Sequence, residues 1–342
     1  MMRMNPDRPL PPAARPADIR RRRMIAAGGA ALAAIARPGQ AQAAYPARPI
    51  RLIVPFAPGG AGDVSARVIA DRFGQRFGSP VIVENRPGAG GNIGAQAAAA
   101  AEPDGYTLLL GFDGTLVINP HVYSKVPFDS LQDFVPIGKI GDIGLLIVAH
   151  PGLEARDLAG AIALSKARRG GLAVGSGGQG TTAHLLIELL KQRTGADLVH
   201  VPYKGAGPAL VGVMGGETPL AVVGVIGVAQ HVASGAVRAL AFSSTQRAPG
   251  LPDVPTIGES GVSGLAVNSW NGLLAPARTP RPVIELLARE LNAALADAGV
   301  RERLAKLGYA SGATSPEAFG AEIRAAFDEY GRVVKTAGIR AD

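Results

Sequence analysis

The stretch VPFAPGGAGD, residues 54–63, joins two segments with different hydrophobic patterns. Before it, Ile50–Val54 is a short run rich in β-branched residues, as in a buried strand. After it, Val64–Phe77 carries apolar residues at helical spacing, with Val68 and Phe73 on the same face. A strand that enters a helix through a glycine-rich turn is the repeating unit of α/β proteins. The stretch therefore predicts an α/β fold.

The alternation continues along the chain and predicts sheets that are mainly parallel. Further strands are expected at Val81–Glu84, Thr107–Leu110, Leu145–Ala149, Leu172–Gly175, Leu198–Val201, Leu220–Val223 and Val237–Phe242. Helical spacing recurs at His184–Arg193. Near the C-terminus one helix is expected from Arg281 to about Leu307, and a second from Pro316 with Thr314 in the capping box.

Two more strand-to-helix junctions are rich in glycine, GSGGQGTT at residues 175–182 and VPYKGAG at residues 201–207. In an open α/β sheet, ligands bind at the carboxyl ends of the strands. The following helices offer unpaired N–H groups and the positive end of their dipoles, so an anion is the expected ligand. Alternatively, each loop is only a tight turn, with Asp63 and Thr181 or Thr182 as ordinary N-caps.

Signatures of catalysis are sparse. Residues 175–180 match G-x-G-x-x-G, but the next strand runs into Pro202-Tyr203-Lys204 and the nearest acid, Asp197, precedes that strand. No P-loop, H-E-x-x-H or intact G-x-S-x-G motif occurs, and the chain has no cysteine. His184 and Glu188 are four residues apart, but two ligands do not make a metal site. We therefore expect neither cofactor nor metal.

Most of the positive charge lies at the N-terminus. Of 342 residues with a formal charge of +8, residues 1–43 hold eight arginines and two aspartates, which leaves +2 for the rest. A basic run, the apolar segment Met24–Ile35 and Ala41-Gln42-Ala43 predict an export signal cleaved near Ala43. Arg21-Arg22-Arg23 resembles the twin-arginine pattern and also suits the general secretory route. Thereafter no apolar stretch is long enough to span a bilayer. We expect a soluble periplasmic protein that does not bind nucleic acid.

The loops also carry a family resemblance that runs from about Tyr45 to Ala341. The chain resembles the Bug-type substrate-binding proteins, the extracytoplasmic receptors of tripartite tricarboxylate transporter systems. The segments that carry the resemblance are Pro55–Gly60 with Asp63, Glu84–Ala95, Pro103–Leu109, Gly180–Thr181 with His184–Leu185, Val201–Gly205, Leu251–Thr256 and Ser269–Trp270 with Gly272–Pro276.

This resemblance implies a type II periplasmic-binding-protein fold, in which two α/β domains joined by two crossing strands close on a ligand. Domain 1 would comprise residues 44–146 and 266–342, and domain 2 residues 147–265. The implied function is capture of a small organic carboxylate without chemical change. Capture would serve uptake through membrane transporter subunits, or sensing, and the protein would be a monomer.

The resemblance also implies which residues bind the ligand. They come from the three glycine-rich loops: Phe56, Pro58, Gly59, Gly60 and Asp63 on one side, Ser176, Gly177, Gly180, Thr181 and His184 on the other, and Tyr203, Lys204 and Gly205 completing the wall. The chain departs from the family at Gly62, where threonine is frequent, at Pro219, where aspartate is common, and at Val222-Val223-Gly224, where Phe-Asp is frequent. These changes favour a plain carboxylate over an amino acid, because an amino group would need a nearby carboxylate.

Two other functions compete with this interpretation. An exported NAD-dependent enzyme would explain the G-x-G-x-x-G match and the twin-arginine pattern. A structural or adhesive protein would need repeats, and the sequence shows none.

Overall fold

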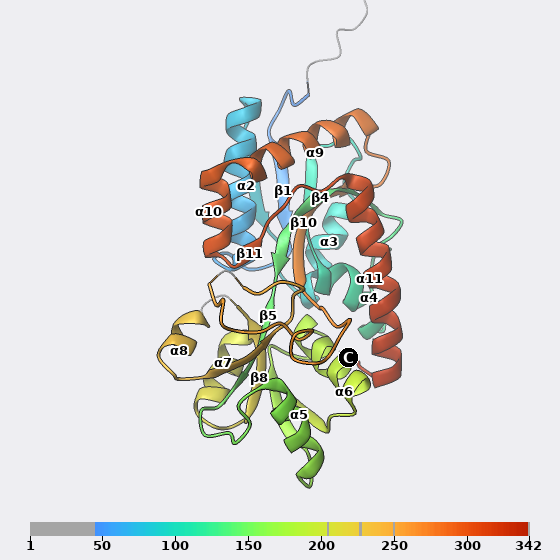
Figure 1. Ribbon diagram of the computed structural model, residues 1–342. Helices are drawn as coiled ribbons and strands as arrows, with labels where there is room; N and C mark the ends of the chain where they lie inside the picture. The colour runs from blue at the N-terminus through green and yellow to red at the C-terminus, as the bar shows by residue number, and fades with distance from the viewer. Residues whose placement is uncertain (1–44, 204, 226–227, 249, 341–342) are drawn as a thin grey trace, which may run out of the picture. The chain divides into compact units, whose positions relative to one another are not determined.

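The computed structural model describes residues 45–203, 205–225, 228–248 and 250–340, so the expected export signal lies outside the described residues. Pro46–Asp342 forms one compact unit. Its strands make two sheets (Figure 1). Sheet A has the order β11 (Tyr309–Ala310), β4 (Phe134–Ile143), β10 (Ser269–Pro276), β3 (Thr107–Phe112), β1 (Ile50–Val54), β2 (Val81–Asn85). Sheet B has the order β7 (Leu198–Pro202), β6 (Leu172–Ser176), β8 (Leu220–Gly224), β5 (Leu145–Ala149), β9 (Arg238–Phe242).

Both sheets are mixed, whereas the sequence predicted mainly parallel pairing. Strands β2, β1 and β3 are parallel, whereas β10 pairs antiparallel with β3, β4 with β10, and β11 with β4. In sheet B, β7, β6 and β8 are parallel, and β5 pairs antiparallel with both β8 and β9, so β9 runs in the same direction as β8. The predicted strands are confirmed within two residues at their ends. Strand β4 was missed because Pro136, Gly138 and Gly141 interrupt its apolar pattern.

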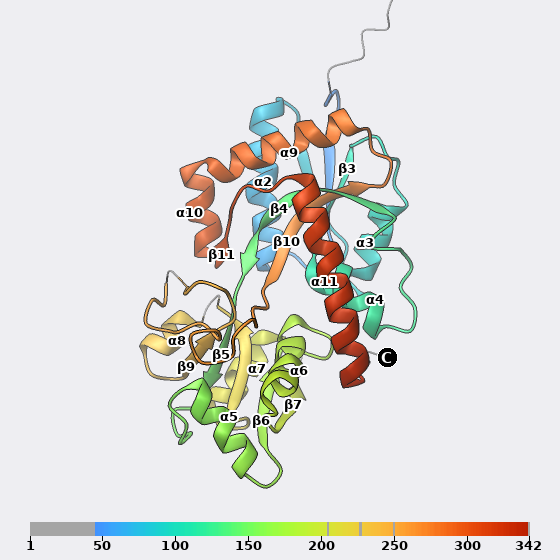
Figure 2. The ribbon, with the colours of Figure 1, turned by 45° about the vertical axis from the view of Figure 1, so that its right-hand side comes forward.

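Helices cover both faces of each sheet, as an α/β fold requires. In sheet A an added Cβ at Gly138 would touch Leu291 of α9, and one at Gly272, on the opposite face, would touch Phe319 of α11. Figures 1 and 2 show α2, α9 and α10 grouped on one side and α3 and α11 on the other. The helices are α2 (Ala61–Phe77), α3 (Asn92–Ala99), α4 (Asn119–Val122), α5 (Leu158–Ala167), α6 (Thr182–Thr194), α7 (Ala206–Met214), α8 (Ala229–Ala233), α9 (Arg281–Ala296), α10 (Ala298–Lys306) and α11 (Pro316–Ala337), with a 3₁₀ turn η1 (Ala89–Gly91) and a π-helical turn η2 (Gly114–Ile118).

Two details of the C-terminal helices correct the sequence prediction. The helix expected from Arg281 to Leu307 is broken at Asp297, whose carboxylate accepts from the amides of Gly299 and Val300 and so starts α10. Helix α11 is capped by Ser315 and not by Thr314. The Thr314 hydroxyl instead accepts a hydrogen bond from the Lys139 amide of β4.

The chain passes between the sheets twice. Strand β4 of sheet A continues through Gly144 into β5 of sheet B, and the chain returns to sheet A at Ser269, where β10 pairs with β4 (Figure 2). We call sheet A with α2–α4 and α9–α11 lobe A, and sheet B with α5–α8 lobe B. One hydrophobic cluster includes Leu109 and Val333 of lobe A and Leu186 and Val222 of lobe B. The domain boundaries at residues 146 and 265 stay a prediction.

Among the described residues, no helix is long and apolar enough to cross a membrane.

The start of the first glycine-rich loop is supported by close packing at Gly94 of α3. A Cβ there would lie 2.8 Å from the Pro55 Cα and 2.9 Å from the Arg86 carbonyl oxygen. Gly94→Ala should therefore lower the free energy of unfolding by about 1–3 kcal/mol, because backbone must move to make room. Urea unfolding measures this. Gly312→Ala is the control, because its Cβ would meet nothing within 4 Å. Equal stability of the two variants would contradict the packing argument.

Candidate ligand-binding site

The first loop, between β1 and α2, is held in shape by Asp63. Its carboxylate accepts from the Gly59 amide at 2.9 Å and from Arg67 Nε and Nη2, both at 3.0 Å. Asn85 Nδ2, at the end of β2, donates to Asp63 at 2.9 Å and to the Phe56 carbonyl at 3.0 Å. Asp63 is thus a structural anchor behind the loop, with its oxygens already occupied.

The hydrogen-bond partners of Asp63 lower the pKa of its carboxyl. Burial alone raises the pKa of this carboxyl, but the hydrogen bonds from Arg67, Gly59 and Asn85 outweigh it and lower the pKa to about 2. Asp63 is therefore ionised at neutral pH, and its charge is neutralised by Arg67.

The front of the first loop is open backbone. Gly60 is the N-cap of α2 and no side chain caps this helix, so its first-turn amides point past the end of the helix. Gly59 has φ +88°, a conformation that favours glycine. Phe56 packs edge-on against Phe112, the last residue of β3, with ring centroids 5.2 Å apart. Pro58 lies in the same exposed turn.

The second loop, between β6 and α6, is ordered by its own hydroxyls. The Ser176 hydroxyl donates to the Gly178 carbonyl at 3.1 Å and lies 2.6 Å from His200 Nε2. Thr181 caps α6: its hydroxyl accepts from the His184 amide and donates to the Gly178 carbonyl. The Gly180 amide donates to His184 Nδ1 at 3.2 Å. Hence part of this loop's donor capacity is used internally.

Two stacked imidazoles support the second loop from beneath. His184 and His200 have ring centroids 3.7 Å apart and interplanar angle 16°. Burial, with the nearby positive charge of Lys191, lowers the pKa of His184 to about 3 and that of His200 to about 4. Both rings are therefore neutral at pH 7. His184 is 4% exposed, so it positions Gly180 and supplies no positive charge.

The third loop extends the pairing of β6 and β7. The Tyr203 amide donates to the Ser176 carbonyl and the Gly205 amide to the Gly177 carbonyl. Gly205, with φ +118°, is the N-cap of α7, and no side chain caps this helix. The Tyr203 hydroxyl donates to Glu217 at 3.0 Å. Lys204 lies outside the described residues.

The structure joins the second and third loops directly and connects both to lobe A. Gly177 lies against Gly205 and Ala206. Asp113, just after β3, accepts from the Thr182 hydroxyl of α6 at 2.6 Å, beside Phe112, which contacts the first loop. The sequence analysis missed Asp113. An acidic residue directly after an apolar strand was the signal that could have identified it.

The arrangement offers backbone donors for an anion. Helices α2 and α7 begin without side-chain caps, Asp63 is fully bonded, and Asp113 is buried. The described residues contain no group of three or more His, Cys, Asp or Glu side chains that could hold a metal.

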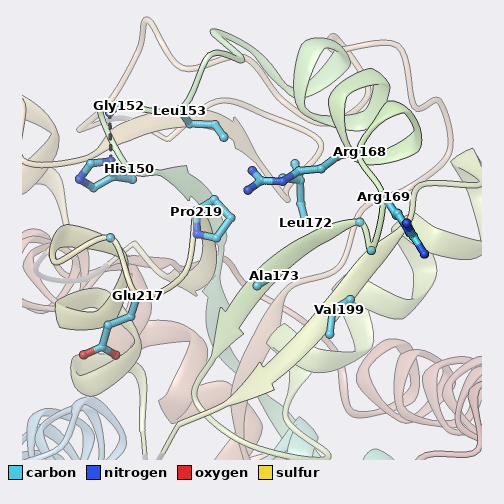
Figure 3. Close-up of a pocket in the computed structure, with 13 residues that line it drawn as sticks. His150, Gly152, Leu153, Arg168, Arg169, Leu172, Ala173, Val199, Glu217 and Pro219 are labelled. Atoms are coloured by element: carbon cyan, nitrogen blue, oxygen red, sulfur yellow. Dashed lines mark hydrogen bonds between the residues drawn. The ribbon is translucent and has the colours of Figure 1, made fainter.

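A cavity of about 640 Å³ lies elsewhere. It lies at the other end of the strands of sheet B, where β6 begins and Pro219 precedes β8. Figure 3 shows Arg168 reaching toward Pro219 and Leu153, while Arg169 points away. Pro219 precedes β8 and lines this cavity with Ala173, three residues before Ser176 on β6. Pro219, where the resembled family commonly has aspartate, therefore lies away from the three loops. Gly224, at the second such position, ends β8 on the side of the loops.

Comparison with known proteins identifies the family. Residues 65–339 match the model described as tripartite tricarboxylate transporter family receptor. The chain belongs to this receptor family. Protein BugT of Bordetella pertussis is 40% identical over 311 residues, which cover 91% of this chain and 95% of BugT. The chain is thus a Bug-type receptor and not an enzyme, so the NAD-dependent alternative is wrong.

Solved structures of similar proteins confirm the periplasmic-binding fold. A Rhodopseudomonas palustris protein solved with adipate is 33% identical, with TM-score 0.76, covering 86% of this chain and 99% of that protein. MatC from the same organism, with bound malate, is 30% identical, with TM-score 0.71, covering 85% of this chain and 100% of MatC. The G-x-G-x-x-G match at residues 175–180 lies at the turn between β6 and α6.

The lowered pKa of Asp63 predicts a pH-dependent part of the stability. Because the folded pKa of about 2 lies below the ordinary 3.8, the contribution is present above pH 4 and lost as pH falls toward 2. Thermal or urea unfolding between pH 5 and pH 2 should show a loss of about 2 kcal/mol in the wild type and a smaller loss in Asp63→Asn.

Asp71→Asn is the matched control, because Asp71 lies on the same helix and its side chain is 62% exposed. It should keep the wild-type pH profile. An Asp63→Asn variant with the same slope as the wild type would show that Asp63 does not anchor the loop.

Proposed function

We propose that this receptor captures a small organic carboxylate in the periplasm, between lobes A and B, and delivers it to a tripartite transporter or to a sensor. The relatives solved with adipate and malate, both dicarboxylates, support this ligand class. The carboxylate would be held by backbone amides and hydroxyls of the three glycine-rich loops.

One observation carries the proposal: α2 of lobe A and α7 of lobe B both start at a glycine with no side-chain cap. Helix ends normally recruit Ser, Thr, Asp or Asn to satisfy their first amides, and an anion can take that place. Around α6, which lies between them in sequence, Thr181 does cap the helix, so a ligand would meet its remaining amides and hydroxyls.

The energies are adequate for a transport receptor. A hydrogen bond to a charged group contributes about 1.5–3 kcal/mol, and micromolar affinity needs about 8 kcal/mol. Several such bonds from two lobes reach this value after the entropic cost of binding.

The same geometry disfavours a ligand with an amino group. Such a group would need a carboxylate near the loops, but Asp63 is bonded to Arg67, and β8 ends at Gly224 without an acid. We therefore infer that the receptor prefers plain carboxylates over amino acids.

Substitution at Gly60 tests the anion site. Gly60→Asp should abolish adipate binding in calorimetry, because a fixed negative charge would occupy the end of α2. The melting temperature should change by less than about 2 °C, since aspartate is a favourable N-cap and Gly60 has an ordinary φ of −74°.

Gly60→Ala is the control, because its Cβ would approach nothing nearer than the Ala57 carbonyl oxygen at 4.0 Å. It should bind adipate as the wild type does. Retained binding in Gly60→Asp would place the anion elsewhere, and a large loss of stability would support the simple-turn alternative.

The preference for plain carboxylates is tested with matched ligands. Thermal-shift and calorimetric titrations should show that adipate binds at least tenfold more tightly than 2-aminoadipate, because the added ammonium group finds no free acid. Tighter binding of the amino acid would overturn this part of the proposal.

A further inference from the structure

Asp113 is a buried carboxylate that ligand capture, as proposed above, does not use directly. Its side chain is 0% exposed, and it lies where β3 gives way to η2. One oxygen accepts from the Ser269 hydroxyl at 2.7 Å and the Trp270 amide at 3.3 Å, and the other accepts from Thr182 at 2.6 Å. Among the described residues, no lysine, arginine or histidine pairs with it.

Stability does not explain why a carboxylate stands at this position. Burial raises the pKa of Asp113 to about 6, although the hydrogen bonds from Thr182, Ser269 and two backbone amides lower it. An acid whose folded pKa is raised destabilises the fold as pH rises from about 4 to about 6, and this cost persists at neutral pH. A neutral, well-packed residue would avoid it. The groups that the two carboxylate oxygens connect therefore indicate the role of Asp113.

The connected segments are the parts of the chain that bring the lobes together. Phe112, adjacent to Asp113, packs on the first loop. Thr182 is the first residue of α6, directly after the Thr181 cap of the second loop. Ser269 and Trp270 begin β10, where the chain returns to sheet A. The Asp113 side chain therefore ties the start of α6 to the return strand, and its neighbour Phe112 contacts the first loop.

In the part of the chain that the structure describes, α6 and the loop before it also make apolar contacts with lobe A. An added Cβ at Gly180 would meet Val122 of α4 at 3.1 Å, and Leu186 of α6 shares a hydrophobic cluster with Val333 of α11. Apolar contacts favour burial but are non-directional. A short hydrogen bond to a charged acceptor does fix direction and distance.

We propose that Asp113 is a positioning residue, which acts through the Thr182 hydroxyl to fix the start of α6, and with it the second loop, against lobe A. The effect on ligand affinity rests on the proposed function, whereas the effect on lobe geometry does not.

The first test measures affinity for adipate by calorimetry. Thr182→Val, which keeps the side-chain shape, should raise Kd about tenfold, the loss of one hydrogen bond to a charged group. Asp113→Asn should raise Kd at least as much, and the double variant should be no weaker than Asp113→Asn alone. Thr182→Ser, which keeps the hydroxyl, should bind like the wild type.

Thr194→Val is the matched control. It removes a hydroxyl from the other end of α6, where Thr194 bonds to the Leu190 carbonyl, and should leave Kd unchanged even if stability falls. If Thr182→Val behaves like Thr194→Val, or if the effects of Asp113→Asn and Thr182→Val multiply in the double variant, the positioning role is wrong.

The second test needs no ligand. Because the chain has no cysteine, spin labels can be placed at Gln75→Cys on α2 and Ala163→Cys on α5, both exposed. The distance distribution between the labels should broaden in Thr182→Val and stay narrow in Thr182→Ser and Thr194→Val. Unchanged distributions overturn the proposal. If the wild type binds no carboxylate while Thr182→Val broadens the distribution, the proposed function fails and the role of Asp113 stands.

Discussion

The hydrogen bond between Asp113 and Thr182 connects the two lobes at the point where their loops must cooperate. A ligand gripped from two sides requires the donors of both sides to be placed within a fraction of an ångström, and apolar packing alone does not provide such precision. Asp63 has a similar role for the first loop in lobe A. Its carboxylate accepts a hydrogen bond from the Gly59 amide and so fixes the shape of the loop.

The side chains that fix the shape of the loops differ from the backbone groups that are proposed to bind the ligand. The acidic side chains of the loops are bonded internally, the imidazoles of His184 and His200 are neutral, and the helix ends at Gly60 and Gly205 have no side-chain cap. In the part of the three loops that the structure describes, the site thus presents amides and hydroxyls. In the proposed site, backbone donors would recognise the carboxylate group but not the rest of a ligand, which fits relatives solved with adipate and with malate.

Local patterns predicted much of the fold, and long-range contacts account for the failures. Short apolar runs identified the strands whose sequence is uninterrupted, and the glycine-rich turns identified the loops. Strand β4 was missed because Gly138 lets α9 approach closely and Gly141 lets β11 do so, and in the local sequence these glycines interrupt the strand pattern. The loop residues were identified, yet the roles of Asp63 and His184 depend on Asn85 and Gly180, and the partners of Asp113 lie 69 and 156 residues away.

The most direct measurement is a crystal structure of the protein grown with adipate. The account predicts one carboxylate with its oxygens about 2.8–3.0 Å from amides at the start of α2 and from donors of the loops that precede α6 and α7. Adipate seated instead in the cavity beside Arg168 and His150, with the glycine-rich loops making no contact to it, would contradict the account.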